Sequence, residues 1–251
     1  MSILEEIIKN KQKELMPSKK RQFFKAITHP GTGDVSLIAE IKKKSPSARD
    51  SAGDQDVVIK AIEYEAACAD AISVVTDKKY FGGTLELFKD IRKATTLPML
   101  MKDFIIHPYQ VIQAEQAGAD ALLIIAALNK YFHPDLLSTL AASSITPVIE
   151  VAHTQELSLP FVKQAEVIGV NARDLNTFQI NIDHACSIIK KISKDKTVIG
   201  FSGVKSRRDI ERFKAAGAKA VLVGEILMKT KDYHLIPLLK GVPDRAGDVK
   251  R

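Results

Sequence analysis

One pattern recurs along the chain and limits its fold more than any other feature. In four segments the end of an amphipathic helix is followed by a small residue or glycine and then by a β-rich run: YEAACADAISVV at 64–75, AEQAGADALLII at 114–125, RFKAAGAKAVLVG at 212–224 and, more loosely, FVKQAEVIGVN at 161–171. The small residue suits a helix C-cap, and the run after it suits a strand. The chain is therefore predicted to alternate helices with strands.

Extending this rhythm outward predicts eight strands, with helical patterns between them that begin near Asp56, Thr84, Pro108 and Asp183. The predicted strands are 36–41, 71–76, 98–102, 120–125, 146–151, 166–171, 197–201 and 219–224. Eight such units in 251 residues indicate a single α/β domain, a parallel (β/α)8 TIM barrel over residues 1–251. The alternative is a doubly wound open sheet, but no GxGxxG follows the first strand, and GTGD at 31–34 precedes a strand and is expected to be a loop.

The first 35 residues fall outside the repeat. Their segment ILEEIIKNKQKELM has helical periodicity. Residues 1–35 are therefore predicted to form an N-terminal helical extension over a barrel mouth.

The cysteines, the apolar stretches and the net charge exclude several classes of function. The two cysteines, Cys68 and Cys186, are far apart and indicate neither a disulfide framework nor a zinc site, which favours a reducing cytoplasm. The longest apolar stretch, 121–128, is too short to span a bilayer, and the acidic N-terminal segment does not read as a signal peptide, so no membrane role is expected. The net charge is +7, but the basic residues are dispersed, so a small anionic substrate is favoured over nucleic acid.

Ionisable residues stand where several predicted strands end. Side chains alternate along a strand, so Glu40 and Lys42 share one face, and Lys102 and Glu150 end the third and fifth strands. Strand carboxyl ends and their loops form the active site of such barrels. Two acids and two bases in one desolvated mouth shift each other's pKa values, which predicts catalytic or substrate-binding roles. Other residues at these ends are Phe104, Asn171, Arg173, Ser202, Gly203, Gly224 and Glu225.

The loops after the last two strands carry a second signal. FSGVKS and LVGEI place glycines where backbone N–H groups of such barrels often bind phosphate. FGG at 81–83 is expected to be only a flexible loop. The histidines show no HExxH spacing and no Ser-His-Asp set is discernible, so neither a catalytic metal nor a serine nucleophile is predicted; His153, near Glu150, is expected to be a loop residue.

Together these residues resemble the indole-3-glycerol-phosphate synthase family of tryptophan biosynthesis. The resemblance runs nearly end to end and rests on AEIKKKSPS, AISVVTDKKYFGG, LPMLMKDFIIHPYQ, GADALLIIAAL, PVIEVAHTQEL, IGVNARDLNTF, FSGV and VLVGEILM. It implies a (β/α)8 barrel that closes the indole ring of 1-(2-carboxyphenylamino)-1-deoxyribulose 5-phosphate, releasing carbon dioxide and water, without cofactor or metal.

The resemblance also implies residue roles. Lys102 would be the general acid at the substrate carbonyl, and Glu150 its partner for proton transfer in dehydration, with Glu40 assisting. Lys42 and Arg173 would lie near the substrate carboxylate and phosphate. The remaining implied roles are a hydroxyl contact by Asn171, a phosphate cradle of Ser45, Ser202, Gly203, Gly224 and Glu225, and an apolar wall of Phe104, Leu123 and Leu175.

The sequence departs from the family pattern at two places. The family's E-S-G after the seventh strand is Phe201-Ser202-Gly203 here, and the ring of Phe201 is expected to offer its face to the substrate's benzene ring. A Gly-Ala pair after the helix at 56–67 is Cys68-Ala69, which replaces the residue best suited to a left-handed C-cap.

Two other function classes remain open on the sequence. Another phosphate-binding barrel enzyme, such as the isomerase of the preceding step, would share the loop glycines but not the E-x-K-x-x-S-P-S and KDF motifs. A non-catalytic barrel that binds a phosphorylated ligand draws its support from Phe201 alone. For the enzyme we expect a small phosphorylated aromatic substrate and a cytoplasmic monomer able to associate with other tryptophan-pathway enzymes.

Overall fold

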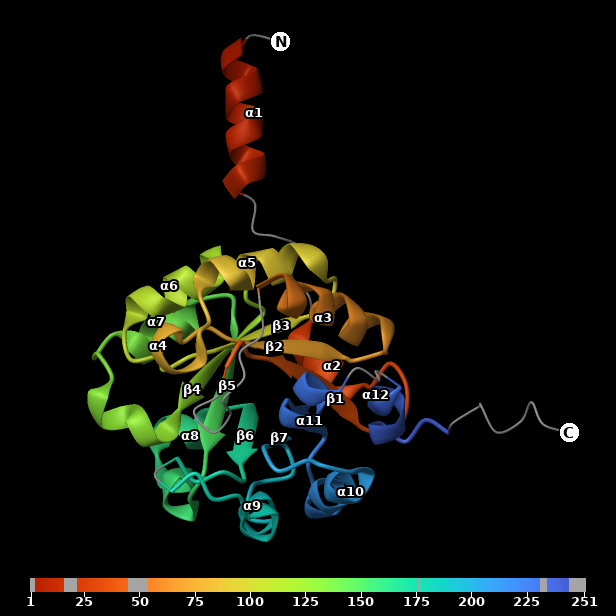
Figure 1. Ribbon diagram of the computed structural model, residues 1–251. Helices are drawn as coiled ribbons and strands as arrows, with labels where there is room; N and C mark the ends of the chain where they lie inside the picture. Colours follow the sequence, from red (N-terminus) through yellow and green to blue (C-terminus); the bar gives the residue numbers. More distant parts are fainter. Residues whose placement is uncertain (1–2, 16–21, 45–53, 176, 231–233, 244–251) are drawn as a thin grey trace, which may run out of the picture.

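The computed structural model describes residues 3–15, 22–44, 54–175, 177–230 and 234–243. Eight parallel strands pair in chain order and β8 pairs with β1, so the sheet closes into a barrel (Figure 1). The prediction of a (β/α)8 barrel is confirmed, and each predicted strand is present to within one residue at either end. The strands are β1 (Ser36–Ile41), β2 (Ala71–Val75), β3 (Met99–Lys102), β4 (Ala121–Ile125), β5 (Thr146–Val151), β6 (Val167–Asn171), β7 (Thr197–Phe201) and β8 (Ala220–Val223).

Helices surround the barrel in Figure 1. They are α1 (Ile3–Leu15), α2 (Phe23–Thr28), α3 (Asp54–Ala66), α4 (Lys78–Phe81), α5 (Leu85–Ala94), α6 (Pro108–Gln116), α7 (Leu136–Ala142), α8 (Pro160–Gln164), α9 (Ile182–Ile189), α10 (Arg207–Ala216), α11 (Glu225–Lys229) and α12 (Leu235–Leu239), with 3₁₀ turns η1 (Ala126–Tyr131) and η2 (Thr154–Ser158). Within the described ranges, no helix is both long and apolar enough to cross a membrane.

The first residues of four helices can be compared with the helix starts predicted from the sequence. Thr84 is the N-cap of α5, where its hydroxyl accepts a hydrogen bond from the N–H of Leu87, and α6 begins at Pro108. Two starts lie earlier than predicted. Helix α9 begins before Asp183 because Asn181 is its N-cap and accepts the N–H of His184. Helix α3 begins at Asp54 rather than Asp56, and its cap lies outside the described residues.

Apolar side chains fill the barrel from its amino end upward. Helix α2 leads into β1 through residues 29–35, and the N–H of Gly31 binds Asp70 just before β2, so α2 lies at the amino end of the strands. Phe23 and Ile27 of α2 are fully buried there against inward-facing strand residues. These interior residues are Ile38, Ala71, Leu100, Ala121, Leu123, Val148, Val167, Ile199, Phe201, Ala220 and Leu222. The interior is therefore closed at the amino end, and a cavity can open only at the carboxyl ends.

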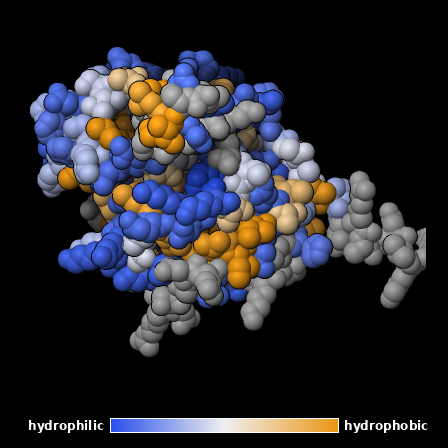
Figure 2. Space-filling view, turned by 90° about the horizontal axis from the view of Figure 1, so that it is seen from above, coloured by the Kyte–Doolittle hydropathy of each residue, from blue (hydrophilic) through white to orange (hydrophobic). Residues whose placement is uncertain are grey.

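The predicted N-terminal extension consists of two different helices. Figure 1 shows α1 apart from the barrel, and its apolar residues Ile3, Leu4 and Ile7 are exposed. Exposed apolar side chains also occur on α3, at Ile59 and Ile62, and Figure 2 shows hydrophobic patches within a largely hydrophilic surface. Coverage of a barrel mouth by α1 stays a prediction.

A buried ion pair joins the last described helix to the turn before β2. Lys240, after α12, is fully buried, and its ammonium lies 2.8 Å from a carboxylate oxygen of Asp70 and donates to the carbonyl of Cys68. Asp70 also accepts the N–H of Leu37 at the start of β1. The left-handed C-cap expected at Cys68 is confirmed, because its φ is +65°. One ammonium thus links the C-terminal helix, the turn after α3 and the first strand.

We expect Lys240→Met to lower the free energy of unfolding by about 3–5 kcal/mol, because it leaves the buried carboxylate of Asp70 without its cation. Urea unfolding followed by circular dichroism measures the loss. Lys214→Met is the matched control, since its partner Asp34 is 52% exposed, and its loss should stay below about 1 kcal/mol. Equal losses in the two variants would contradict a structural role for the buried pair.

Candidate active site

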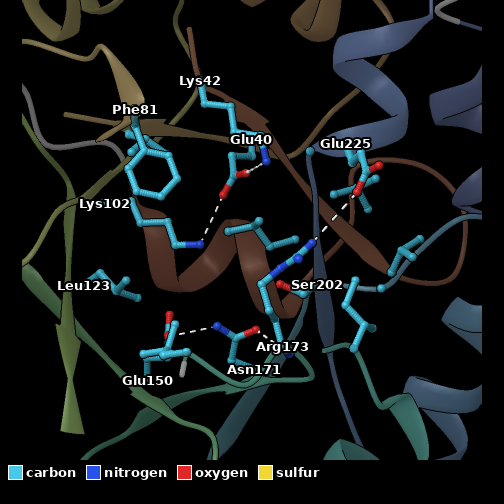
Figure 3. Close-up of a pocket in the computed structure, with 18 of the residues that line it drawn as sticks. Glu40, Lys42, Phe81, Lys102, Leu123, Glu150, Asn171, Arg173, Ser202 and Glu225 are labelled. Atoms are coloured by element: carbon cyan, nitrogen blue, oxygen red, sulfur yellow. Dashed lines mark hydrogen bonds and ion pairs between the residues drawn. The ribbon is translucent and has the colours of Figure 1, made fainter. Parts of the chain in front are cut away.

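A single cavity at the carboxyl ends of the strands brings most of the predicted site residues together (Figure 3). Its walls come from the ends of seven strands and from the loops after the strands; β7 contributes only through its following loop. The predicted residues that line it are Glu40, Lys42, Lys102, Phe104, Leu123, Glu150, Asn171, Arg173, Leu175, Ser202, Gly203, Gly224 and Glu225. Convergence follows from the closed parallel barrel, because all strand carboxyl ends meet at the same rim.

Glu40 on β1 is the most heavily paired carboxylate of the cavity. Its two oxygens accept from different ammonium groups, Oε1 from Lys42 at 3.0 Å and Oε2 from Lys102 at 3.1 Å. Burial alone would raise the pKa of Glu40, but the two lysines outweigh it and lower the pKa to about 2. Gly224 makes room for this carboxylate, since a Cβ there would lie 2.6 Å from Oε1. Glu40 is thus a permanent anion at neutral pH.

Lys102 on β3 occupies the centre of the charge network. Burial by itself lowers its pKa, but the carboxylates of Glu40 and Glu150, together with the hydrogen bond to Glu40, raise the pKa above the usual lysine value; Arg173 acts in the opposite direction. Figure 3 shows the ammonium pointing into the cavity. Lys102 therefore carries a positive charge at neutral pH, and its ammonium can donate hydrogen bonds into the cavity.

Glu150 on β5 has an environment that differs from that of Glu40. It is 2% exposed, and burial raises its pKa although the charge of Lys102 and a hydrogen bond from Asn171 act to lower it. Asn171 donates from Nδ2 to Oε1 of Glu150 and accepts the backbone N–H of Arg173, both at 2.9 Å. The other oxygen, Oε2, is buried without a hydrogen-bond partner among the described residues. Glu150 is thus held in one orientation and favours the protonated state more than Glu40 does.

The loops after β7 and β8 form the side of the cavity across from Lys102 and Leu123 (Figure 3). Ser202 and Gly203 both have left-handed backbone, with φ of +64° and +85°, which turns the chain sharply at the rim. A Cβ at Gly203 would lie 2.8 Å from Ile180. Arg173 lies beside this turn, where Nη1 donates to the carbonyl of Phe178 and Nη2 is 3.9 Å from Glu225. This side offers a guanidinium and the tight turn at Ser202-Gly203 to an anionic group.

Apolar side chains complete the cavity beside the ionisable groups. Phe104, Leu123 and Leu175 line it as the resemblance predicted, and Phe81 joins them with its ring centroid 6.5 Å from that of Phe104. Other lining residues that the sequence reasoning missed are Val75, Asp103, Ile125, Phe178, Ile180, Val204, Lys205, Leu222 and Val223. FGG at 81–83 was expected to be a flexible loop, yet Phe81 ends helix α4 and Gly82 is its left-handed C-cap. One feature of the sequence could have indicated Phe81: FGG follows the second predicted strand, and the loops after the strands lie at the rim where the cavity opens.

Three residues singled out in the sequence are not among the described lining residues, and of these His153 lies in a loop as expected. The ring of Phe201 is fully buried and is not among the lining residues, so the structure does not bring it to the cavity. Ser45 lies outside the described residues. His153 is the N-cap of η2, and its Nε2 is 3.5 Å from Asp174.

A closed parallel barrel whose strand ends hold paired acids and bases defines a (β/α)8-barrel protein with the site of an enzyme. The chain belongs to the indole-3-glycerol phosphate synthase family, whose model matches residues 3–236. Relatives of that name include one from Alkaliphilus metalliredigens, 42% identical with 79% of this chain and 77% of the relative covered. Another, from Caldanaerobacter subterraneus, is 34% identical and covers 96% and 98%.

Solved structures with the same fold are more distant in sequence. Thiamine phosphate pyrophosphorylase from Pyrococcus furiosus aligns with a TM-score of 0.60 at 13% identity, covering 84% of this chain and 96% of that one. A chain of the Pyrococcus furiosus tryptophan synthase a2b2 complex aligns with a TM-score of 0.59 at 16% identity, covering 83% and 96%. At these identities the likeness shows the barrel fold alone.

We expect Glu150→Gln to be more stable than the wild type at pH 7. A pKa raised by folding means that the folded chain holds this proton more tightly, so ionising Glu150 costs stability once the pH exceeds the unfolded value of about 4.3. Glutamine cannot ionise, and its oxygen can still accept from Asn171. The gain should shrink as the pH falls towards 4, in urea unfolding at several pH values.

Glu40→Gln is the control of opposite sign. Its lowered pKa means that the carboxylate stabilises the fold above the unfolded pKa and loses this effect as the pH falls towards 2. The variant should therefore lose about 3 kcal/mol at pH 7 and less at pH 3. A loss of stability at pH 7 in Glu150→Gln would contradict the assigned difference between the two carboxyls.

Proposed function

We propose that this chain is a carboxy-lyase that converts 1-(2-carboxyphenylamino)-1-deoxyribulose 5-phosphate to indole-3-glycerol phosphate, carbon dioxide and water. The observation that carries the proposal is the ammonium of Lys102, held by Glu40 and flanked by Glu150 inside a cavity with an aromatic wall. Family membership supplies the substrate, and the cavity supplies groups suited to its chemistry. Indole-glycerol phosphate formation by the purified chain, followed by its fluorescence, is the direct test.

Ring closure would use Lys102 as the acid. The ring carbon that bears the carboxylate attacks the substrate's ketone carbon, a carbon–carbon bond forms, and the ketone oxygen takes a proton from the ammonium. Loss of carbon dioxide then restores the aromatic ring. Glu40 remains an anion throughout and keeps the ammonium in place, which makes Glu40 a positioning partner for the acid.

Dehydration would use Glu150. The hydroxyl group formed in the first stage takes a proton and leaves as water, the adjacent ring carbon bonded to nitrogen gives up a proton, and the carbon–carbon double bond of the new ring forms. A carboxyl with a raised pKa is suited to transfer protons near neutral pH. Asn171 fixes one oxygen of Glu150, so the other, Oε2, is the atom for this transfer.

The two sides of the cavity match the two ends of the substrate. Phe81, Phe104 and Leu123 form an apolar surface for the anthranilate ring and exclude water from the reacting carbons. Arg173, the turn at Ser202-Gly203 and the start of α11 at Gly224-Glu225 would hold the phosphate, for which the carboxylate of Glu225 must turn away from Arg173.

We expect Lys102→Ala to lower kcat by about 10²–10⁴-fold while the circular dichroism spectrum stays unchanged, because the variant lacks the positioned acid. Lys42→Ala is the matched control. Both lysines bind Glu40, at 3.1 and 3.0 Å, and both side chains are 20% exposed. Lys42→Ala should chiefly raise KM, because Lys42 is assigned to anion binding. Near wild-type kcat in Lys102→Ala would refute its assignment as the acid.

We expect inorganic sulfate to compete with the substrate by occupying the phosphate position. Replacing Arg173 by alanine should raise both the KM for substrate and the Ki for sulfate by about tenfold or more, the effect of losing a charged hydrogen bond. Arg212→Ala removes the same charge from a surface pair with Asp183 and should change neither constant. A crystal of the complex with phosphate elsewhere, or sulfate inhibition unaffected by Arg173→Ala, would exclude this position.

A further inference from the structure

Phe201 is the largest side chain near the candidate acid that the reaction scheme leaves unused. It ends β7, it is fully buried, and it is not among the residues that line the cavity. In a ring of eight strands joined in chain order, β7 lies opposite β3, which carries Lys102. The ring of Phe201 nevertheless reaches Lys102, with the ammonium nitrogen 5.3 Å from the ring centroid. The contact therefore crosses the barrel axis.

The neighbouring strand is shaped to admit this ring. Asn171 on β6 pairs in register with Phe201, and Gly169 precedes it by two residues on the same inward face. A Cβ at Gly169 would lie 2.4 Å from Cε2 and 2.5 Å from Cζ of Phe201. Any other residue at 169 would displace the ring from its place under the ammonium. The glycine and the phenylalanine thus pack as one unit, which lies on the amino-end side of the ionisable groups.

From this geometry we propose that Phe201 is a positioning residue that holds the ammonium of Lys102 by a cation–π contact from below, while Glu40 holds it from the side. The role of Lys102 as an acid rests on the function proposed above, but the contact itself does not. A desolvated ammonium gains from an aromatic face, and such a contact favours the charged form of lysine.

Several charged groups act on the ammonium of Lys102 besides the ring of Phe201. Glu40 on β1 and Glu150 on β5 favour the charged form, whereas Arg173 after β6 disfavours it, and Lys42 shares Glu40 with it. Burial opposes the charged form most strongly. The ring is an uncharged group among these neighbours, so it can support the ammonium without adding a carboxylate that would need its own partner.

The test replaces Phe201 site-specifically by 4-fluoro-, 3,4,5-trifluoro- and pentafluorophenylalanine, which weaken the negative face of the ring stepwise while keeping its shape. Trace acetylation at pH 9, read by mass spectrometry, reports the neutral fraction of Lys102 relative to exposed Lys93. We expect the acetylation rate of Lys102 to rise stepwise to about tenfold, equivalent to about one pKa unit. The alkaline limb of the kcat profile should move to lower pH, with KM constant within about twofold.

The matched control is the same series at Phe213. That ring is also fully buried and lies on a glycine, since a Cβ at Gly200 would be 2.6 Å from Cδ1 of Phe213. It belongs to the layer between α10 and the barrel, so its fluorination should leave the labelling of Lys102 unchanged. Thermal unfolding of both series shows that the chains remain folded.

Two results would overturn the proposal. A flat labelling rate for Lys102 along the Phe201 series would mean that the ring only packs, and a rising KM with unchanged labelling would make it a substrate contact instead. If the wild-type chain forms no indole-glycerol phosphate but labelling still follows fluorination, the cation–π contact stands and the proposed reaction fails. The two hypotheses are thereby separated.

Discussion

The buried carboxylate of Glu40 is the constraint on which the active end of this barrel depends. Glu40 is only 5% exposed, so its carboxylate must be neutralised where it lies, and the ammonium groups of Lys42, just after β1, and of Lys102 on β3 do so. This pairing fixes the direction of Lys102, and it requires Gly224 just after the adjacent strand β8, because a side chain there would occupy the place of the carboxylate. The residues at the ends of β1, β3 and β8 therefore all accommodate one buried negative charge.

Glu150 gains its different character from the same network. It has no cation of its own in hydrogen-bond contact among the described residues, only the amide of Asn171 and the more distant charge of Lys102, so burial dominates and raises its pKa. Two glutamates in one cavity thus differ in pKa direction because one receives two ammonium groups and the other receives an amide. Such a difference lets one carboxyl stay ionised while the other exchanges a proton.

Stability and candidate chemistry are placed at opposite ends of the barrel. Phe23 and Ile27 close the amino end, and the pair of Lys240 and Asp70 joins the chain's last described helix to the first strand there. The carboxyl end carries the buried charges, the left-handed turn at Ser202-Gly203 and an unpartnered carboxyl oxygen on Glu150. These features cost stability, and a barrel closed firmly at the other end can tolerate them.

The sequence by itself determined the eight strands and the shared face of Glu40 and Lys42, because helix and strand periodicities are local and side chains alternate along a strand. It also indicated which strand ends carry ionisable groups, since the barrel gathers all carboxyl ends at one rim. Only the tertiary structure decided that Phe81 joins the cavity, and that Phe201 leaves it for a place against Gly169 and beneath Lys102. These contacts join distant strands, and whether a ring points along the axis or into the cavity depends on the space that residues on other strands leave for it.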